Sequence, residues 1–96
     1  MQWTCREITA RNQLYGFMKY QVKCDLPGYF SAREWCWNRF GPGIEFAHWK
    51  NYFSLVGVAM PWAWESDKFQ GASINSGKLY FPDDATLAAF EYEWKT

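Results

Sequence analysis

The segment Phe17–Leu26 alternates between apolar and polar side chains from its second residue onward. A period of two residues is typical of a β-strand with one buried face and one solvated face. The predicted buried face carries Met18, Tyr20, Val22, Cys24 and Leu26, and the solvated face carries Lys19, Gln21, Lys23 and Asp25. Because such a strand needs neighbouring strands and a covering layer, it constrains the fold more than any other segment does.

A turn and a helix follow this strand. Pro27 and Gly28 end the strand, since proline cannot continue a hydrogen-bonded ladder and glycine opens a turn. Ser31 and Glu34 have the spacing of a capping box, which predicts a helix over 32–40 with an inner face of Ala32, Trp35, Cys36 and Phe40. Gly41 comes directly after the helix, where a left-handed C-cap is expected.

The N-terminal segment has two interpretations. Thr4 and Glu7 repeat the capping-box spacing and favour a helix over 5–15 that Gly16 closes. The competing interpretation is an extended strand through Trp3, Cys5 and Glu7, because the apolar face of the helix is interrupted.

Beyond the break at Gly41-Pro42-Gly43, the pattern favours more strands. Segments 44–49 and 52–60 are expected to form a hairpin around Lys50-Asn51, with Gly57 at a bulge or close approach. After Pro61, segment 62–65 is expected to be extended, with Trp62 and Trp64 on one face. The polar segment 66–77 reads as the longest and most mobile loop.

The C-terminal part is predicted to contain a strand over 78–81, a helix that Asp83 or Asp84 caps, and a short edge strand over 90–94. Ninety-six residues make one domain. The order of predicted elements indicates an α+β fold: a small antiparallel sheet with two or three helices in a ferredoxin-like βαββαβ arrangement, with an extra N-terminal segment.

Composition excludes several classes of function. The formal net charge is zero, which does not favour non-specific nucleic-acid binding. Residues 1–50 hold seven Lys and Arg against four Asp and Glu, and residues 51–96 hold three against six, so the surface is either ordinarily scattered or bipolar. No apolar run reaches the length of a membrane span, and we expect no membrane association.

The side chains that catalysis or metal binding would need are few. Cys5, Cys24 and Cys36 are odd in number and contain no Cys-x-x-Cys pair, and His48 is the only histidine. We therefore expect a reducing, cytoplasmic setting, no metal and no cofactor. An enzyme that uses one cysteine with His48 remains the weakest alternative.

Aromatic residues make up 22% of the chain, more than so small an interior readily encloses. Those outside the clearest core patterns are interleaved with cationic side chains, and this combination suits a protein interface or stacking on a nucleotide. The competing interpretation is that they complete the core or a homodimer interface. The candidate binding residues are Trp37, Arg39, His48, Trp49, Lys50, Tyr52, Trp62 and Trp64.

Two segments, 26–41 and 79–94, resemble short uncharacterised proteins of tailed bacteriophages. The first runs from Leu26-Pro27-Gly28 to Gly41. The second joins an aromatic strand, an Asp-Ala pair, Phe90 and a late Trp94. The resemblance covers about a third of the chain; it implies a phage origin and a host-cytoplasmic setting, and brings no catalytic residue.

The function that these observations favour is binding without catalysis. We expect a small phage protein that binds a host protein through an aromatic-rich surface and inhibits or redirects it, with a homodimer as one possible state. The alternative is a protein that sequesters a nucleotide or nucleotide-like signal between aromatic rings.

Overall fold

The structure is a computed structural model that describes residues 1–66 and 76–95, so most of the predicted polar loop over 66–77 lies outside the described residues. A five-stranded sheet forms its centre, in the order β1-β2-β5-β4-β3, with all neighbouring strands antiparallel except the parallel pair β3 and β4. The strands are β1 (Trp3–Glu7), β2 (Tyr20–Asp25), β3 (Ile44–Glu45), β4 (Ala63–Ser66) and β5 (Ser76–Phe81).

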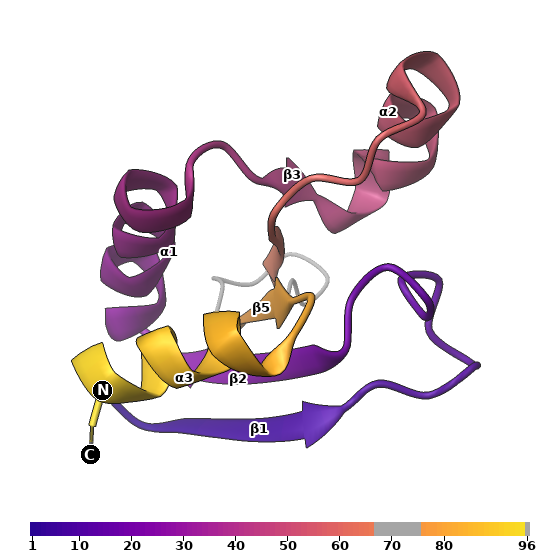
Figure 1. The fold of residues 1–96 in the computed structure, drawn as a ribbon. Helices are drawn as coiled ribbons and strands as arrows, with labels where there is room; N and C mark the ends of the chain where they lie inside the picture. The colour runs from indigo at the N-terminus through magenta and orange to yellow at the C-terminus, as the bar shows by residue number, and fades with distance from the viewer. Residues whose placement is uncertain (67–75, 96) are drawn as a thin grey trace, which may run out of the picture.

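Helices α1 (Gly28–Phe40) and α3 (Asp84–Glu93) cover one face of this sheet. A 3-10 turn, η1 (Phe46–His48), leads into α2 (Trp49–Val56), which stands apart from α1 and α3 (Figure 1). The prediction of an α+β fold with a small antiparallel sheet and two or three helices is confirmed. The element order is ββαβαββα, because a helix replaces the expected middle hairpin and the last helix replaces the final strand.

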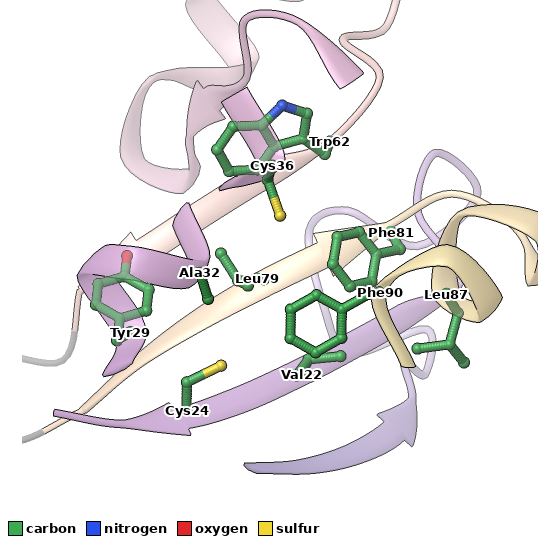
Figure 2. Close-up of a cluster of buried hydrophobic side chains, with 10 residues drawn as sticks. All are labelled: Val22, Cys24, Tyr29, Ala32, Cys36, Trp62, Leu79, Phe81, Leu87 and Phe90. Atoms are coloured by element: carbon green, nitrogen blue, oxygen red, sulfur yellow. The ribbon is translucent and has the colours of Figure 1, made fainter. Parts of the chain in front are cut away.

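The helical face of the sheet carries the larger hydrophobic cluster (Figure 2). Val22 and Cys24 of β2, Leu79 and Phe81 of β5 and Phe90 of α3 belong to this cluster, and all five are fully buried. The cluster also contains Tyr29, Ala32, Cys36, Trp62 and Leu87. The predicted inner positions of β2 are thus confirmed at Val22 and Cys24.

A smaller cluster lies on the other face. Met18 belongs to it, which corrects the expectation that Met18 shares a face with Val22; the regular strand begins only at Tyr20. Gln21 is buried although its alternation predicts solvation, because this face is partly covered. The cluster contains Ile8, Leu14, Met18, Trp49, Ala63 and Tyr80.

The N-terminal segment is strand β1, so the predicted helix over 5–15 is wrong and the competing interpretation is right. Trp3 explains why. Its ring packs edge-on against Phe90 at 5.2 Å between centroids, and its indole N–H donates to the Trp94 carbonyl at 2.6 Å. Pairing with β2 over five residues and this distant packing outweigh a local capping signal.

The expected hairpin over 44–60 is also wrong. Its residues form β3, η1 and α2. Trp49 and Phe53 are four residues apart, and both contact the ring of Phe17, which favours a helix. Gly57, read from the sequence as a bulge, is instead the left-handed C-cap of α2, with φ of 75° and its N–H donating to the Phe53 carbonyl.

Two helix boundaries differ from the expected ones. Helix α1 begins at Gly28 and not at Ser31, since one further turn buries the ring of Tyr29 over Gly77, where any Cβ atom would collide with it. Helix α3 continues to Glu93, so the predicted edge strand is wrong; Phe90 and Trp94 stack at helical spacing. The predicted cap at Asp83 is confirmed. Gly41 is the C-cap of α1 as predicted, but its backbone, with φ of 91° and ψ of −172°, is not in the left-handed αL conformation that was expected.

Candidate binding surfaces

One side of helix α1 exposes large side chains. Phe30, Arg33 and Trp37 follow one another at three- and four-residue spacing and so share a face. The inner face of the same helix buries Tyr29, Ala32 and Cys36 one position earlier in each turn. The ring of Trp37 is 50% exposed and that of Phe30 is 44% exposed, which is unusual for aromatic side chains flanking a packed face.

Strand β4 adds a ring to this side of α1. The guanidinium carbon of Arg33 lies 4.3 Å from the ring centroid of Trp64 and 5.3 Å from that of Phe30. A guanidinium over a Trp face is the most favourable form of cation–π contact. Because the flat guanidinium is held against the rings, its edge keeps N–H groups that a ligand's acceptors can use.

These side chains enclose a groove of about 550 Å³ between α1 and β4. The groove is lined by Phe30, Arg33, Glu34, Trp37, Asn38 and Trp64. We call it the α1–β4 groove.

The wall behind Trp37 belongs to the core. Trp37 packs edge-on against Trp62 at 6.5 Å, and the buried indole of Trp62 donates its N–H to the Gly41 carbonyl at 2.7 Å. Gly43 lies so close to the Trp62 ring that a Cβ atom would not fit. The segment Gly41-Pro42-Gly43, predicted as a break, therefore packs against the core residue Trp62, and Trp62 in turn supports Trp37 of the groove.

The predicted binding residues are divided among several places. Trp37 and Trp64 line the α1–β4 groove, whereas Trp49 and Trp62 are buried in the two clusters and are closed to a partner. Arg39 is exposed on α1, and its guanidinium lies 5.5 Å from the Phe40 ring. His48 and Lys50 are exposed and Tyr52 is partly exposed, all on η1 and α2.

Sequence reasoning missed Phe30 and Arg33 as site residues. Their spacing from Trp37 was the available signal. The capping-box interpretation places Phe30 before the helix and so off any helical face, which hides this spacing.

The segment around α2 exposes apolar side chains without aromatic rings. Leu55 is 87% exposed, Val58 62% and Val56 53%. His48 lies 3.6 Å from the Glu45 carboxylate, which makes a local exposed pair. Helix α2 stands apart from α1 (Figure 1), and none of these side chains lines the α1–β4 groove.

The face of the sheet opposite α1 and α3 carries a chain of hydrogen bonds across four strands. Arg6 Nε donates to Gln21 Oε1 at 2.9 Å, Gln21 Nε2 donates to the Tyr80 hydroxyl at 3.0 Å, and that hydroxyl donates to Glu65 at 2.8 Å. Burial, and then the bond to Glu65, raises the pKa of Tyr80 far above its ordinary value.

The thiols are poorly suited to nucleophilic chemistry at neutral pH. Burial raises the pKa of Cys24 and of Cys36 to about 12. Burial, followed by Glu91 and Glu7, also raises the pKa of the exposed Cys5. All three stay protonated at neutral pH, whereas the thiolate is the reactive form.

Across residues 1–66 and 76–95, no cluster of His, Cys, Asp and Glu side chains is arranged to hold a metal ion. None of the helices in the described part of the chain is long and apolar enough to span a bilayer. Comparison of the sequence and structure with protein-family models, curated proteins and solved structures finds no match.

Proposed function

We propose that the protein acts by binding a partner protein through the α1–β4 groove. The observation that carries the proposal is the half-exposed ring of Trp37 beside an Arg33 guanidinium already stacked on Trp64. Trp and Arg are the residues that most often dominate the energy of protein interfaces. Here they sit on a helix and a strand, so little conformational entropy is lost on binding.

The expected partner offers an apolar side chain for the groove and an acceptor for the edge of Arg33. A carboxylate suits this guanidinium well, because the two groups form parallel hydrogen bonds. In the setting that the phage resemblance implies, the partner is a host cytoplasmic protein, which the chain inhibits or redirects. The protonated thiols support binding over catalysis.

The test is affinity capture from host lysate with three forms of the tagged chain: wild type, Trp37→Ala, and Tyr92→Ala as the matched control. Tyr92 is also an exposed ring, 75% accessible, but it lies on α3 outside the groove. Wild type and the control are expected to retain one stoichiometric partner, and Trp37→Ala to weaken its binding by roughly thirtyfold, the cost of losing a hot spot.

Equal capture by all three forms, or none by any, would remove the proposal. Recovery of a second copy of the chain alone, lost in the Trp37→Ala form, would assign the groove to a homodimer.

A second candidate rests on the same rings. Phe30 and Trp64 lie against the Arg33 guanidinium, and Trp37 lines the same groove. Rings beside a cation also suit a nucleotide base and its phosphate. Nucleotides are then expected to quench tryptophan fluorescence in the wild type but not in Trp64→Leu. No quenching by any nucleotide rejects this candidate and leaves the protein-binding proposal intact.

A further inference from the structure

The open part of the sheet face opposite the helices brings basic side chains together in register. The antiparallel pairing places Thr4 of β1, Lys23 of β2, Lys78 of β5 and Glu65 of β4 in one row across the strands. The next row contains Arg6, Gln21 and Tyr80. These residues come from four separate segments, and only strand pairing assembles them.

Lys23 and Lys78 are directly opposite each other, and like charges in such a position destabilise a sheet. Lys78 lies 3.9 Å from the Glu65 carboxylate. Lys23 forms no ion pair within residues 1–66 and 76–95, and its side chain is exposed. The sheet therefore holds the Lys23 ammonium group beside that of Lys78, and Lys23 has no carboxylate partner among the described residues.

The basic side chains surround a hollow of about 310 Å³. Its lining is Thr4, Cys5, Arg6, Gln21, Lys23 and Lys78, which includes three cations and no carboxylate. Glu65 lies outside this lining and offsets part of the charge of Lys78. The three cations together attract a compact, multiply charged anion.

The buried network fixes the orientation of Arg6. Gln21 is only 7% exposed and is anchored by the Tyr80 hydroxyl, so its oxygen holds Arg6 Nε. The terminal nitrogens of Arg6 make no ion pair among the described residues. A guanidinium fixed in this way is prepared for bidentate contact with phosphate oxygens.

We propose that this hollow binds a small ligand with two phosphoryl groups, which Arg6, Lys23 and Lys78 neutralise. The hollow exceeds what one phosphate ion would fill, and a diphosphate carries about three negative charges at neutral pH. No exposed aromatic ring lines the hollow, so base stacking, which single-stranded nucleic acid uses, is not offered there. The site lies on the opposite face from the α1–β4 groove and does not depend on the function proposed for it.

The test is calorimetric titration of the full chain with pyrophosphate, with orthophosphate and a short single-stranded oligonucleotide as separate arms. Saturable one-to-one binding of pyrophosphate, stronger than that of orthophosphate, is expected. Lys23→Gln is expected to raise Kd at least about tenfold, which corresponds to about 1.4 kcal/mol. The control, Lys50→Gln, removes an exposed lysine on α2 and is expected to leave Kd unchanged.

Tyr80→Phe tests the positioning of Arg6, since it removes the hydroxyl that anchors Gln21 but no charge. It is expected to raise Kd by a smaller factor than Lys23→Gln does. Absence of pyrophosphate binding, binding unaffected by Lys23→Gln, or binding of the oligonucleotide alone would each overturn the proposal. The Trp37→Ala form should bind pyrophosphate normally, which separates this site from the groove.

Discussion

The two faces of the sheet are built differently. On the helical face, nine of the ten described cluster residues are fully buried, and the indoles of Trp3 and Trp62 have acceptors. On the other face, three of the six described cluster residues are fully buried. The buried indole nitrogen of Trp49 on this face has no acceptor among the described residues. The same is true of the indole nitrogen of Trp94 at the rim of the helical face.

This contrast separates the main source of stability from the proposed anion site. The helical face carries the larger cluster of buried side chains, and burial of apolar surface is the dominant favourable contribution to folding. The other face is closed only at the end near α2, and its polar end is left exposed. A chain that is stabilised mainly from one side can keep on the opposite side a cation such as Lys23, which forms no ion pair within residues 1–66 and 76–95.

The largest expected effect concerns the centre of the helical face. Phe90→Ala removes a fully buried ring that packs on Trp3, Trp35 and Phe81, and it should lower the free energy of unfolding by about 3–5 kcal/mol. Phe53→Ala is the corresponding change on the other face, where Phe53 is a partly buried ring packed on the smaller cluster. It should lower the free energy of unfolding by clearly less than Phe90→Ala does. Urea denaturation measures both, and equal losses would contradict the contrast between the faces.

A sharper comparison exchanges one indole on each face for a smaller ring. Trp62→Phe leaves the Gly41 carbonyl without its donor and opens space beside Gly43, which should cost about 2–3 kcal/mol. Trp49→Phe removes a buried N–H that has no acceptor among the described residues, so it should lower the free energy of unfolding by about 1 kcal/mol or less. Thermal and urea unfolding of the two variants should rank them in this order, and the reverse order would contradict it.

The cap of α3 gives a smaller, pH-dependent effect. The Asp83 carboxylate accepts from the backbone N–H of Thr86 at 2.8 Å and from its hydroxyl at 2.7 Å. These bonds lower the pKa of Asp83 below its ordinary value of 3.8. Asp83→Ala should cost about 1 kcal/mol at neutral pH.

Because the native pKa is the lower one, the cap's contribution is complete above pH 3.8 and is lost as the pH falls through the native value. The difference between wild type and Asp83→Ala should therefore narrow only in acid. If the difference in free energy of unfolding between wild type and Asp83→Ala stays constant until the Asp83 carboxylate is fully protonated, the charged cap is not its cause.

The smallest expected effect has the opposite sign. Lys23→Glu replaces a like-charge pair by an attractive one with Lys78 and should raise the free energy of unfolding by about 0.2–1 kcal/mol. The same variant should lose all stabilisation by pyrophosphate. A variant that is destabilised would show that Lys23 supports the fold itself, and the open face would then not be a part of the sheet left for anion binding.

Local patterns predicted several features correctly. The alternation at Val22 and Cys24, the break before Ile44 and the Asp83 cap each depend on neighbouring residues, and each is present. The failures have other causes. Segments 5–15, 44–60 and 90–94 do not form the predicted elements. The N-terminal segment and segment 44–60 pack on distant rings, Phe90 and Phe17. Segment 90–94 stays helical because Phe90 and Trp94 stack four residues apart.

The candidate sites divide in the same way. The aromatic excess was visible in the composition. Whether a given tryptophan is exposed depends on which residues pack against it in the folded chain. Trp62 faces Gly43 and is sealed, while Trp37, on the preceding helix, is half exposed.

By itself, the sequence determined the central strand, the helix that follows it, the cap of the last helix and the surplus of aromatic rings. The strand, the helix and the cap are each specified within one turn of helix or a few residues of strand, where local sterics and hydrogen bonding decide the conformation. The surplus of rings follows from composition alone. Only the tertiary structure decided which rings stay exposed and which cations meet across the strands. Strand register and side-chain packing join residues far apart in the chain, and their energies outweigh local preferences.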